Sequence, residues 1–171
     1  MNAPSTAASG EAIERARAHF FAGNAHFEAG RLDAARADYE AALALVPGRA
    51  SVLANLGVTL CRQQQWQPAI TTLDAALLAD PTHADAWAAL GLCREATGQW
   101  AGAVHALQRA TALGARSGAL CLSSAMCLLR LERLPEALDA LDAALALDPT
   151  LGEAWSQRGH LMREAGHLAE A

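Results

Sequence analysis

Six histidines and 18 acidic residues give this chain the side-chain types that most often act as general acids or bases and as metal ligands. His26 and Glu28 are the closest acid–base grouping, but residues two apart on a helix point in different directions. Asp139 and Asp142 fall on a helix that we expect to face solvent. The histidines form no His-Glu-x-x-His motif. We therefore predict no catalytic residue, no metal site and no cofactor, and we expect that this chain is not an enzyme by itself.

The cysteines and the basic residues exclude further kinds of chemistry. Cys61, Cys93, Cys121 and Cys127 form no Cys-x-x-Cys motif and lie within helical patterns, so we expect buried, reduced thiols. All thirteen basic residues are arginine, and without a lysine amine there is neither a Schiff-base nucleophile nor a P-loop of the usual type. The net charge of −5 argues against a nucleic-acid-binding surface. No small-molecule substrate is evident.

The location of the protein is predicted from its first residues and its hydropathy. Residues 1–10 contain neither the basic segment nor the apolar run of a secretory signal. No uncharged stretch is long enough to span a bilayer. We therefore expect a cytoplasmic protein with no membrane partner. Residues 1–10 are small and polar and contain proline and glycine, so we expect a disordered tail, followed by a structured domain over 11–171.

A repeat of 34 residues organises that domain. It is most visible in a series of alanines, Ala35, Ala69, Ala103, Ala137 and Ala171. A fixed interval of this length indicates one supersecondary unit copied along the chain, and hence a stack rather than a single globule. The predicted units are 16–49, 50–83, 84–117, 118–151 and a partial unit at 152–171. Each has two helical runs separated by a short break.

Other residues recur at the same interval and have packing roles. Small residues in the first helical run let the paired helices approach closely, and they are Gly23, Gly57, Gly91, Ala125 and Gly159. Large apolar residues fill the turn between the helices, and they are Leu32, Trp66, Trp100, Leu134 and Leu168. Packing therefore accounts for the tryptophans without a ligand site. Pro47, Pro81 and Pro149 end their units, because proline cannot continue a helix.

The third unit reads Trp87-x-x-Leu90-Gly91, followed by Ala103-x-x-x-Leu107. This pattern resembles the tetratricopeptide repeat (TPR) of bacterial-type proteins, and the resemblance covers 16–171. It implies an all-α fold, a right-handed α-solenoid of antiparallel helix pairs with about four and a half units.

The fourth and fifth units depart from the pattern. Ser124 and Ala125 stand where the pattern has leucine and glycine, and Arg158 stands at the leucine position of the fifth unit. That position is normally buried, so either Arg158 extends outward or the last helix is displaced.

The resemblance also implies a site. In this family the first helix of every pair lines a concave groove in which peptides of partner proteins bind. Carrying the groove positions over to this chain gives Phe20, Asn24, Phe27, Asn55, Val58, Arg62, Leu92, Glu95, Leu122, Met126, Leu129 and Arg130. The apolar members form a strip that, if exposed, fits an apolar strand-like segment or one face of an amphipathic helix.

Some family members grip the C-terminal carboxylates of a partner with basic and asparagine side chains. Asn24 and Asn55 stand at the two asparagine positions of that clamp, but Phe20, Asp85 and Ala89 stand at its basic positions. An aspartate and a phenylalanine cannot hold a carboxylate, so we expect no such clamp. The asparagines can still bond a peptide backbone, since an amide both donates and accepts.

We therefore predict a protein–protein interaction scaffold that binds a protein or peptide with an apolar segment in its concave groove. Filling of the groove by another part of the same protein is the intramolecular alternative. The partial fifth unit stops at Ala171, so we also expect a longer native chain. The alternative function is then an N-terminal regulatory or substrate-presenting repeat domain of a larger enzyme, such as a glycosyl-, methyl- or sulfotransferase.

Overall fold

The computed structural model describes the backbone of residues 6–169 and the side chains of residues 10–163. These residues form nine helices and no strand, in the order α1 (Thr6–Glu28), α2 (Leu32–Leu45), α3 (Ala50–Arg62), α4 (Trp66–Ala79), α5 (Ala84–Ala96), α6 (Trp100–Ala112), α7 (Gly118–Arg130), α8 (Leu134–Leu147) and α9 (Gly152–Ala169). Odd-numbered helices are the first helices of the units, and even-numbered ones are the second helices. The all-α solenoid predicted from the sequence is confirmed.

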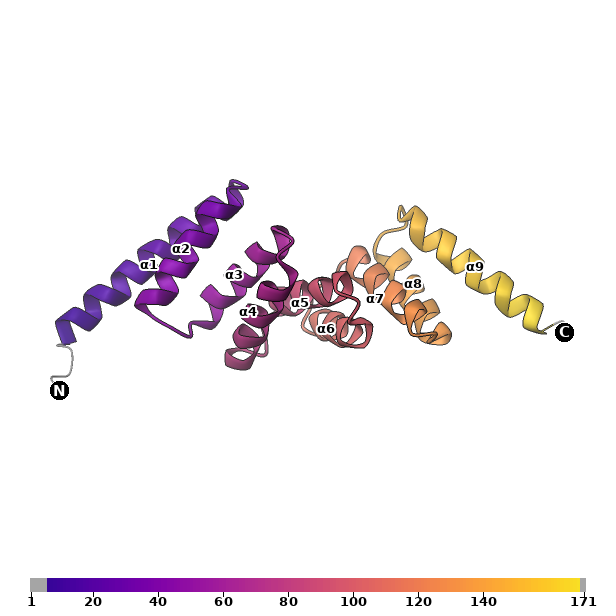
Figure 1. The fold of residues 1–171 in the computed structure, drawn as a ribbon. Helices are drawn as coiled ribbons and strands as arrows, with labels where there is room; N and C mark the ends of the chain where they lie inside the picture. The colour runs from indigo at the N-terminus through magenta and orange to yellow at the C-terminus, as the bar shows by residue number, and fades with distance from the viewer. Residues whose placement is uncertain (1–5, 170–171) are drawn as a thin grey trace.

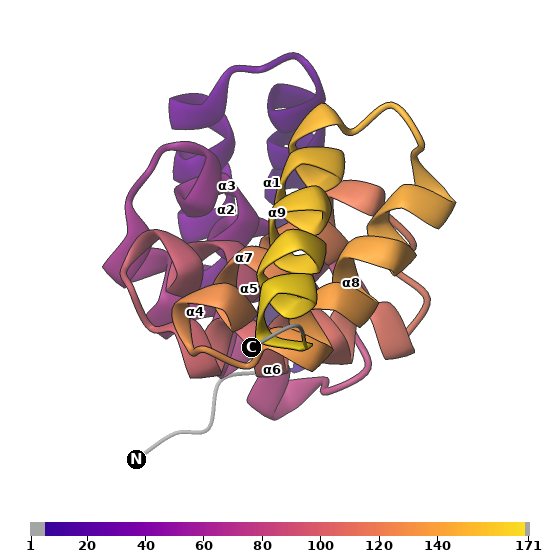
Figure 2. The same cartoon turned by 90° about the vertical axis from the view of Figure 1, so that its right-hand side faces the viewer.

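The helices follow one another in chain order along the stack (Figure 1). Each second helix packs against the first helix of its own unit and against the first helix of the next unit, and neighbouring first helices from α1 to α7 also contact one another. Figure 2 looks along the stack and shows α5, α7 and α9 nearer the centre, with α4, α6 and α8 nearer the outside. The first helices therefore line the inner face.

Close approach of the two helices in each unit explains the series of small residues. A Cβ atom placed on Gly57 would lie 2.5 Å from Cγ of Leu73, and one on Gly91 would lie 2.6 Å from Cγ of Leu107. No Cβ has room at such distances, so glycine lets each leucine of the second helix rest directly on the backbone of the first. In the fourth unit Ala125 is fully buried at this place.

The alanines that reveal the repeat are buried where the second helices meet the first. Ala35, Ala69, Ala103 and Ala137 are all 0% exposed, while Ala171 lies outside the described residues. Leu168 lies beyond the described side chains. The largest cluster of buried side chains extends over the first three units, from α2 to α6, and two smaller clusters hold the later units together.

The turns between paired helices use a left-handed residue. Gly30 and Gly98 take this conformation with φ of +71° and +74°, which glycine adopts without steric cost. Gln64 and Glu132 take it with φ of +60° and +58°. A side chain in this region costs roughly 1–2 kcal/mol, so the second and fourth turns are strained and are maintained by the packing around them.

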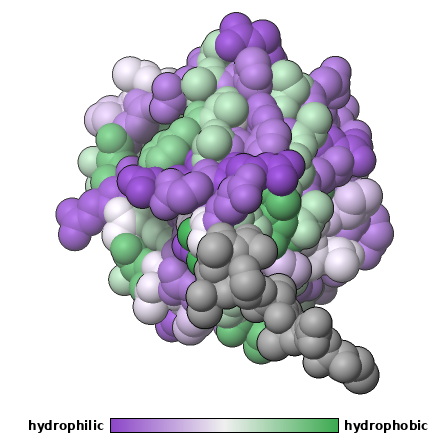
Figure 3. Space-filling view, turned by 90° about the vertical axis from the view of Figure 1, so that its left-hand side faces the viewer, coloured by the Kyte–Doolittle hydropathy of each residue, from purple (hydrophilic) through white to green (hydrophobic). Residues whose placement is uncertain are grey.

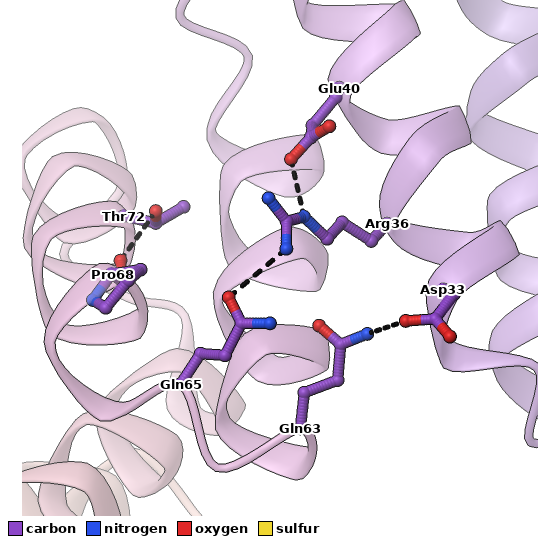
Figure 4. Close-up of polar contacts among 7 residues, drawn as sticks. All are labelled: Asp33, Arg36, Glu40, Gln63, Gln65, Pro68 and Thr72. Carbon is purple, nitrogen blue, oxygen red and sulfur yellow. Dashed lines mark hydrogen bonds and ion pairs between the residues drawn. The ribbon is translucent and has the colours of Figure 1, made fainter.

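Side-chain hydrogen bonds tie the second turn to the first unit (Figure 4). Gln63 donates from Nε2 to Oδ1 of Asp33 at 2.7 Å, and Arg36 donates from Nη1 to Oε1 of Gln65 at 3.2 Å. Arg36 also bonds Glu40 at 2.7 Å, one helical turn further along α2. The polar faces of neighbouring units are thus joined as well as their apolar faces.

The two ends of the described chain differ from expectation. Helix α1 begins at Thr6, inside the segment expected to be a disordered tail, and residues 1–5 lie outside the described residues. Helix α9 continues to Ala169, through Leu168, which was predicted to fill a turn between two helices. The domain boundaries at 10 and 11 stay a prediction.

Helix α9 also shows how Arg158 is accommodated. Its guanidinium extends outward and pairs with Asp142 of α8 through Nε and Oδ1 at 2.5 Å. Trp155 and Met162 are 52% and 50% exposed, because no second helix among the described residues covers this side of α9. At the opposite end of the molecule, hydrophobic side chains form patches among hydrophilic ones (Figure 3), and Phe21 of α1 is exposed. None of the described helices is long and apolar enough to cross a membrane.

A pair of glycine substitutions tests the close contact between paired helices. Gly91→Ala should lower the free energy of unfolding by roughly 1–3 kcal/mol, because the new Cβ overlaps Leu107. Gly159→Ala should raise it by up to about 1 kcal/mol, since nothing lies within 4 Å of that Cβ and alanine favours the helix. Urea unfolding of both variants measures the difference. Effects of the same sign and size would contradict this packing.

Candidate functional site

The inner face of the stack contains a groove of about 590 Å³ between α1, α3 and α5, which we name the N-terminal groove. Half of the predicted site residues line it, namely Asn24, Phe27, Asn55, Val58, Arg62 and Leu92. Its floor is apolar, and its lining also includes the charged side chains of Glu28 and Asp85. Residues of three units, far apart in sequence, therefore meet at one place.

A second hollow of about 410 Å³ lies between α5, α7 and α9, and we name it the C-terminal hollow. Four more predicted residues line it, namely Glu95, Leu122, Met126 and Arg130. Trp100, at the start of α6, and Glu153, on α9, complete the wall. Trp100 was predicted only as a filler of the turn, and its indole thus has a second role at the inner face.

The remaining two predicted residues lie elsewhere. Phe20 lines a separate hollow of about 370 Å³ at the N-terminal end, next to Val46, and its ring centroid lies 6.2 Å from that of Tyr39. Leu129 packs against the buried cluster that contains Val104 and Leu128. The structure thus brings ten of the twelve predicted residues into two hollows, and it leaves Phe20 and Leu129 outside both.

A hydrogen-bonded set of polar groups lies in the N-terminal groove. The Tyr39 hydroxyl and Nδ2 of Asn55 both donate to Oδ1 of Asn24, each at 2.8 Å. Among the described residues, Nδ2 of Asn24 and Oδ1 of Asn55 have no hydrogen-bond partner, so the groove offers one donor and one acceptor. Burial raises the pKa of the Tyr39 hydroxyl above the ordinary value for tyrosine, which is itself well above neutral pH, so the hydroxyl is a donor there.

Sequence reasoning missed Tyr39 because it belongs to a second helix. Its place in the repeat is that of Leu73, Leu107 and Leu141, and all four side chains are buried. The one available signal was an aromatic hydroxyl at a position where the other units have leucine. A buried hydroxyl needs a polar partner, and the two asparagines of the groove provide it.

Each hollow contains an arginine stacked on an aromatic ring. The guanidinium carbon of Arg62 lies 4.3 Å from the ring centroid of Phe27, and that of Arg130 lies 6.0 Å from Trp100. Such contacts stabilise the cation and hold its planar group in one orientation. Neither arginine forms an ion pair within the described part of the chain, so these ring contacts are what positions them.

The carboxyl group of Glu95 is electrostatically perturbed. Partial burial is the main cause that raises its pKa, the nearby Glu153 raises it further, and a hydrogen bond with Ser123 lowers it. Desolvation and a like charge both disfavour the ionised form. The C-terminal hollow thus contains a carboxylate whose ionised form would be stabilised by an added positive charge.

The four cysteines are free, and three of them are buried, as expected for Cys93, Cys121 and Cys127. Burial raises the pKa of the Cys127 thiol to about 12. Cys61 is only half-buried and lines the N-terminal groove. A hydrogen bond with the Cys93 thiol lowers the pKa of Cys61 and raises that of Cys93. Cys61 is therefore the thiol nearest to anything bound in the groove.

His26 and Glu28 are separated, as their spacing predicts. Glu28 lines the N-terminal groove, whereas His26 faces Asp38 of α2, with Nε2 and Oδ2 3.5 Å apart. His19 bonds the same carboxylate through Nδ1 at 2.8 Å. These contacts join α1 to α2. No group of three or more His, Cys, Asp or Glu side chains that could hold a metal ion occurs in the described part of the chain.

Comparison with known proteins bears on the class of this fold. Residues 26–93 match the family model described as tetratricopeptide repeat, and residues 62–144 match that of anaphase-promoting complex, cyclosome, subunit 3. No curated protein sequence matches the chain significantly.

Solved structures resemble it over most of its length. A crystal structure of MamA protein superposes with a TM-score of 0.80 at 23% identity, covering 90% of this chain and 84% of that one. YrrB, titled a TPR protein with an unusual peptide-binding site, superposes with a TM-score of 0.80 at 25% identity, covering 92% and 84%. The APC/C hetero-tetramer Cut9–Hcn1 gives a TM-score of 0.72 at 23% identity, with 84% of this chain matched to only 29% of that chain.

These findings define the fold as a solenoid of helix-pair repeats. The resemblance expected from the sequence is confirmed: the chain is built of tetratricopeptide repeats.

A titration tests the environment of Glu95. Its pKa should lie above that of Glu136, whose carboxyl pKa is lowered by the Arg133 side chain. Because the raised pKa makes the folded state bind the proton more tightly, ionisation of Glu95 destabilises the fold as the pH rises through that pKa. Glu95→Gln should therefore be more stable than the wild type at neutral pH, with the difference vanishing in acid.

Carbon-13 NMR of the carboxyl groups measures the two pKa values. Urea unfolding at neutral pH and in acid measures the stability of Glu95→Gln relative to the wild type. Glu153→Gln should move the pKa of Glu95 part of the way down, since it removes the like charge. Titration of Glu95 at or below the pKa of Glu136 would contradict the assignment.

Proposed function

We propose that this chain is a protein–protein interaction scaffold that binds an extended segment of a partner protein along its inner face. The observation that carries the proposal is the N-terminal groove, where apolar lining residues adjoin an amide donor and acceptor that have no partner among the described residues. Phe27, Val58 and Leu92 can bury an apolar side chain of the partner, while Asn24 and Asn55 bond its backbone.

The amide pair favours an extended segment over a helix. A helix uses its backbone N–H and C=O groups internally, so only its ends could reach these side chains. An extended chain exposes both groups at every residue, and alternate side chains can then enter the apolar floor. YrrB is titled as having a peptide-binding site, which supports the same kind of role here. On this proposal the chain is a cytoplasmic adaptor with no catalysis, cofactor, nucleic acid or membrane of its own.

A second proposal is that these repeats serve a larger assembly or enzyme, as a regulatory or substrate-presenting domain. The exposed Trp155 and Met162 of α9 favour it, because the corresponding face of α5 is covered by α6. Another protein element that covers α9 would bury both side chains. A glycosyl-, methyl- or sulfotransferase domain is one such possibility, and the groove would then hold a segment of its substrate.

Charged substitutions in the groove test the first proposal. A random peptide-display library selected on the wild type should yield peptides that bind with micromolar or better affinity. Leu92→Glu combined with Met126→Glu should abolish that binding, because both changes place a carboxylate in the apolar lining. Circular dichroism should show unchanged helix content.

Leu78→Glu is the matched control, because Leu78 is 89% exposed on the second helix α4 and should tolerate the charge. Selection of no peptide at all would overturn the proposal. Peptides that bind the double variant as well as the wild type would show that they bind elsewhere.

A further inference from the structure

The N-terminal groove and the C-terminal hollow are related by the repeat. Arg62 and Arg130 stand two repeat lengths apart, and so do Val58 and Met126. The carboxylates Asp85 and Glu153 have the same relation, and so do the polar side chains Asn55 and Ser123. An arginine, an acid, an apolar residue and a small polar residue thus occur in equivalent places in both.

The unit between them lacks this set. One repeat length after Asn55, Arg62 and Asp85 the chain has alanine, at Ala89, Ala96 and Ala119. At these three repeat positions the chain therefore has polar residues, then alanine, then polar residues again, with a period of two units. Sequence repetition alone would place the same residue types in every unit, so this alternation is a property of this chain.

Both hollows carry an excess of negative charge. Glu28 and Asp85 accompany Arg62 in the N-terminal groove, and Glu95 and Glu153 accompany Arg130 in the C-terminal hollow.

The acidic side chains of the hollows are also available to a ligand. Within residues 10–163, no ion pair joins Asp85 or Glu153 to a cation of this chain. The arginines that line the same hollows contact aromatic rings instead. Each hollow thus combines an apolar wall with two carboxylates, which suits the methylene stem and the charged end of an arginine or lysine side chain.

We propose that the N-terminal groove and the C-terminal hollow are two binding subsites, which we call stations, for one partner segment. This segment carries a basic residue at each end of a short apolar stretch. This inference rests on the proposed function and specifies the chemistry of the partner. The stations centre on α3 and α7, and α5 packs between these helices. At about 8–10 Å per helix contact the stations are about 16–20 Å apart. An extended chain spans that distance with about five or six residues.

Three synthetic peptides test the charge preference. They share an alternating leucine–alanine core of about five or six residues. The first peptide carries an arginine at each end of this core, the second a glutamine at each end, and the third a glutamate at each end. Fluorescence polarisation should show about tenfold tighter binding for the arginine peptide than for the glutamine peptide, which corresponds to about 1.4 kcal/mol. The glutamate peptide should bind more weakly than both, and added salt should narrow the differences.

The outcomes separate this inference from the proposed function. Equal binding of all three peptides, lost in the Leu92→Glu and Met126→Glu double variant, would overturn the charge preference and leave the groove as the site. Binding of none of them, together with failure of the library selection, would overturn both. An arginine peptide with a single charged end that binds as tightly as the doubly charged one would overturn the pairing of the stations.

Substitutions in each station provide the matched controls. Asp85→Asn and Glu153→Gln should each weaken binding of the arginine peptide several-fold while leaving the glutamine peptide unaffected. Asp139→Asn, an exposed residue of the second helix α8, should change neither. Asp85→Lys combined with Glu153→Lys should reverse the preference in favour of the glutamate peptide. An unchanged preference in that double variant would contradict the assignment of the stations.

Discussion

The contact between a small residue on the first helix and a large side chain on the second is the constraint on which the rest of this structure depends. Leu73 rests on Gly57 and Leu107 on Gly91 at distances that leave no space for a methyl group. This contact fixes both the separation of the paired helices and their rotation about their own axes. Because it recurs every 34 residues, one pairing geometry is copied along the chain.

Fixing the rotation of the first helices decides which of their residues meet on the inner face. Residues at the same place in successive units lie side by side there, so Asn24 can share a hydrogen bond with Asn55 although 31 residues separate them. The chemistry of the groove is therefore a property of the stack and not of any single unit. A unit taken alone would have neither its floor nor its walls.

Most of the fold could be predicted from the sequence, because packing positions such as Gly91 and Ala103 impose the same requirement in each copy. Ten of the twelve predicted groove positions also lie in the two hollows, because the repeat places equivalent residues of successive first helices on the same face. The sequence could not predict Tyr39 in the groove, because its role depends on contact between a second helix and two first helices. It also could not predict the unbroken α9, because the turn it lacks depends on packing against a second helix.

The uneven distribution of the buried clusters along the stack has a consequence for cooperativity. The largest cluster lies in the first three units, while α9 is held by one neighbouring unit and exposes Trp155. In a stack where each unit contacts only its neighbours, local stability falls toward such an end. A partner that spans both hollows would join this less stable end to the stable middle. Binding would then be coupled to protection of α9 from local unfolding, and hydrogen exchange there would report occupancy of the inner face.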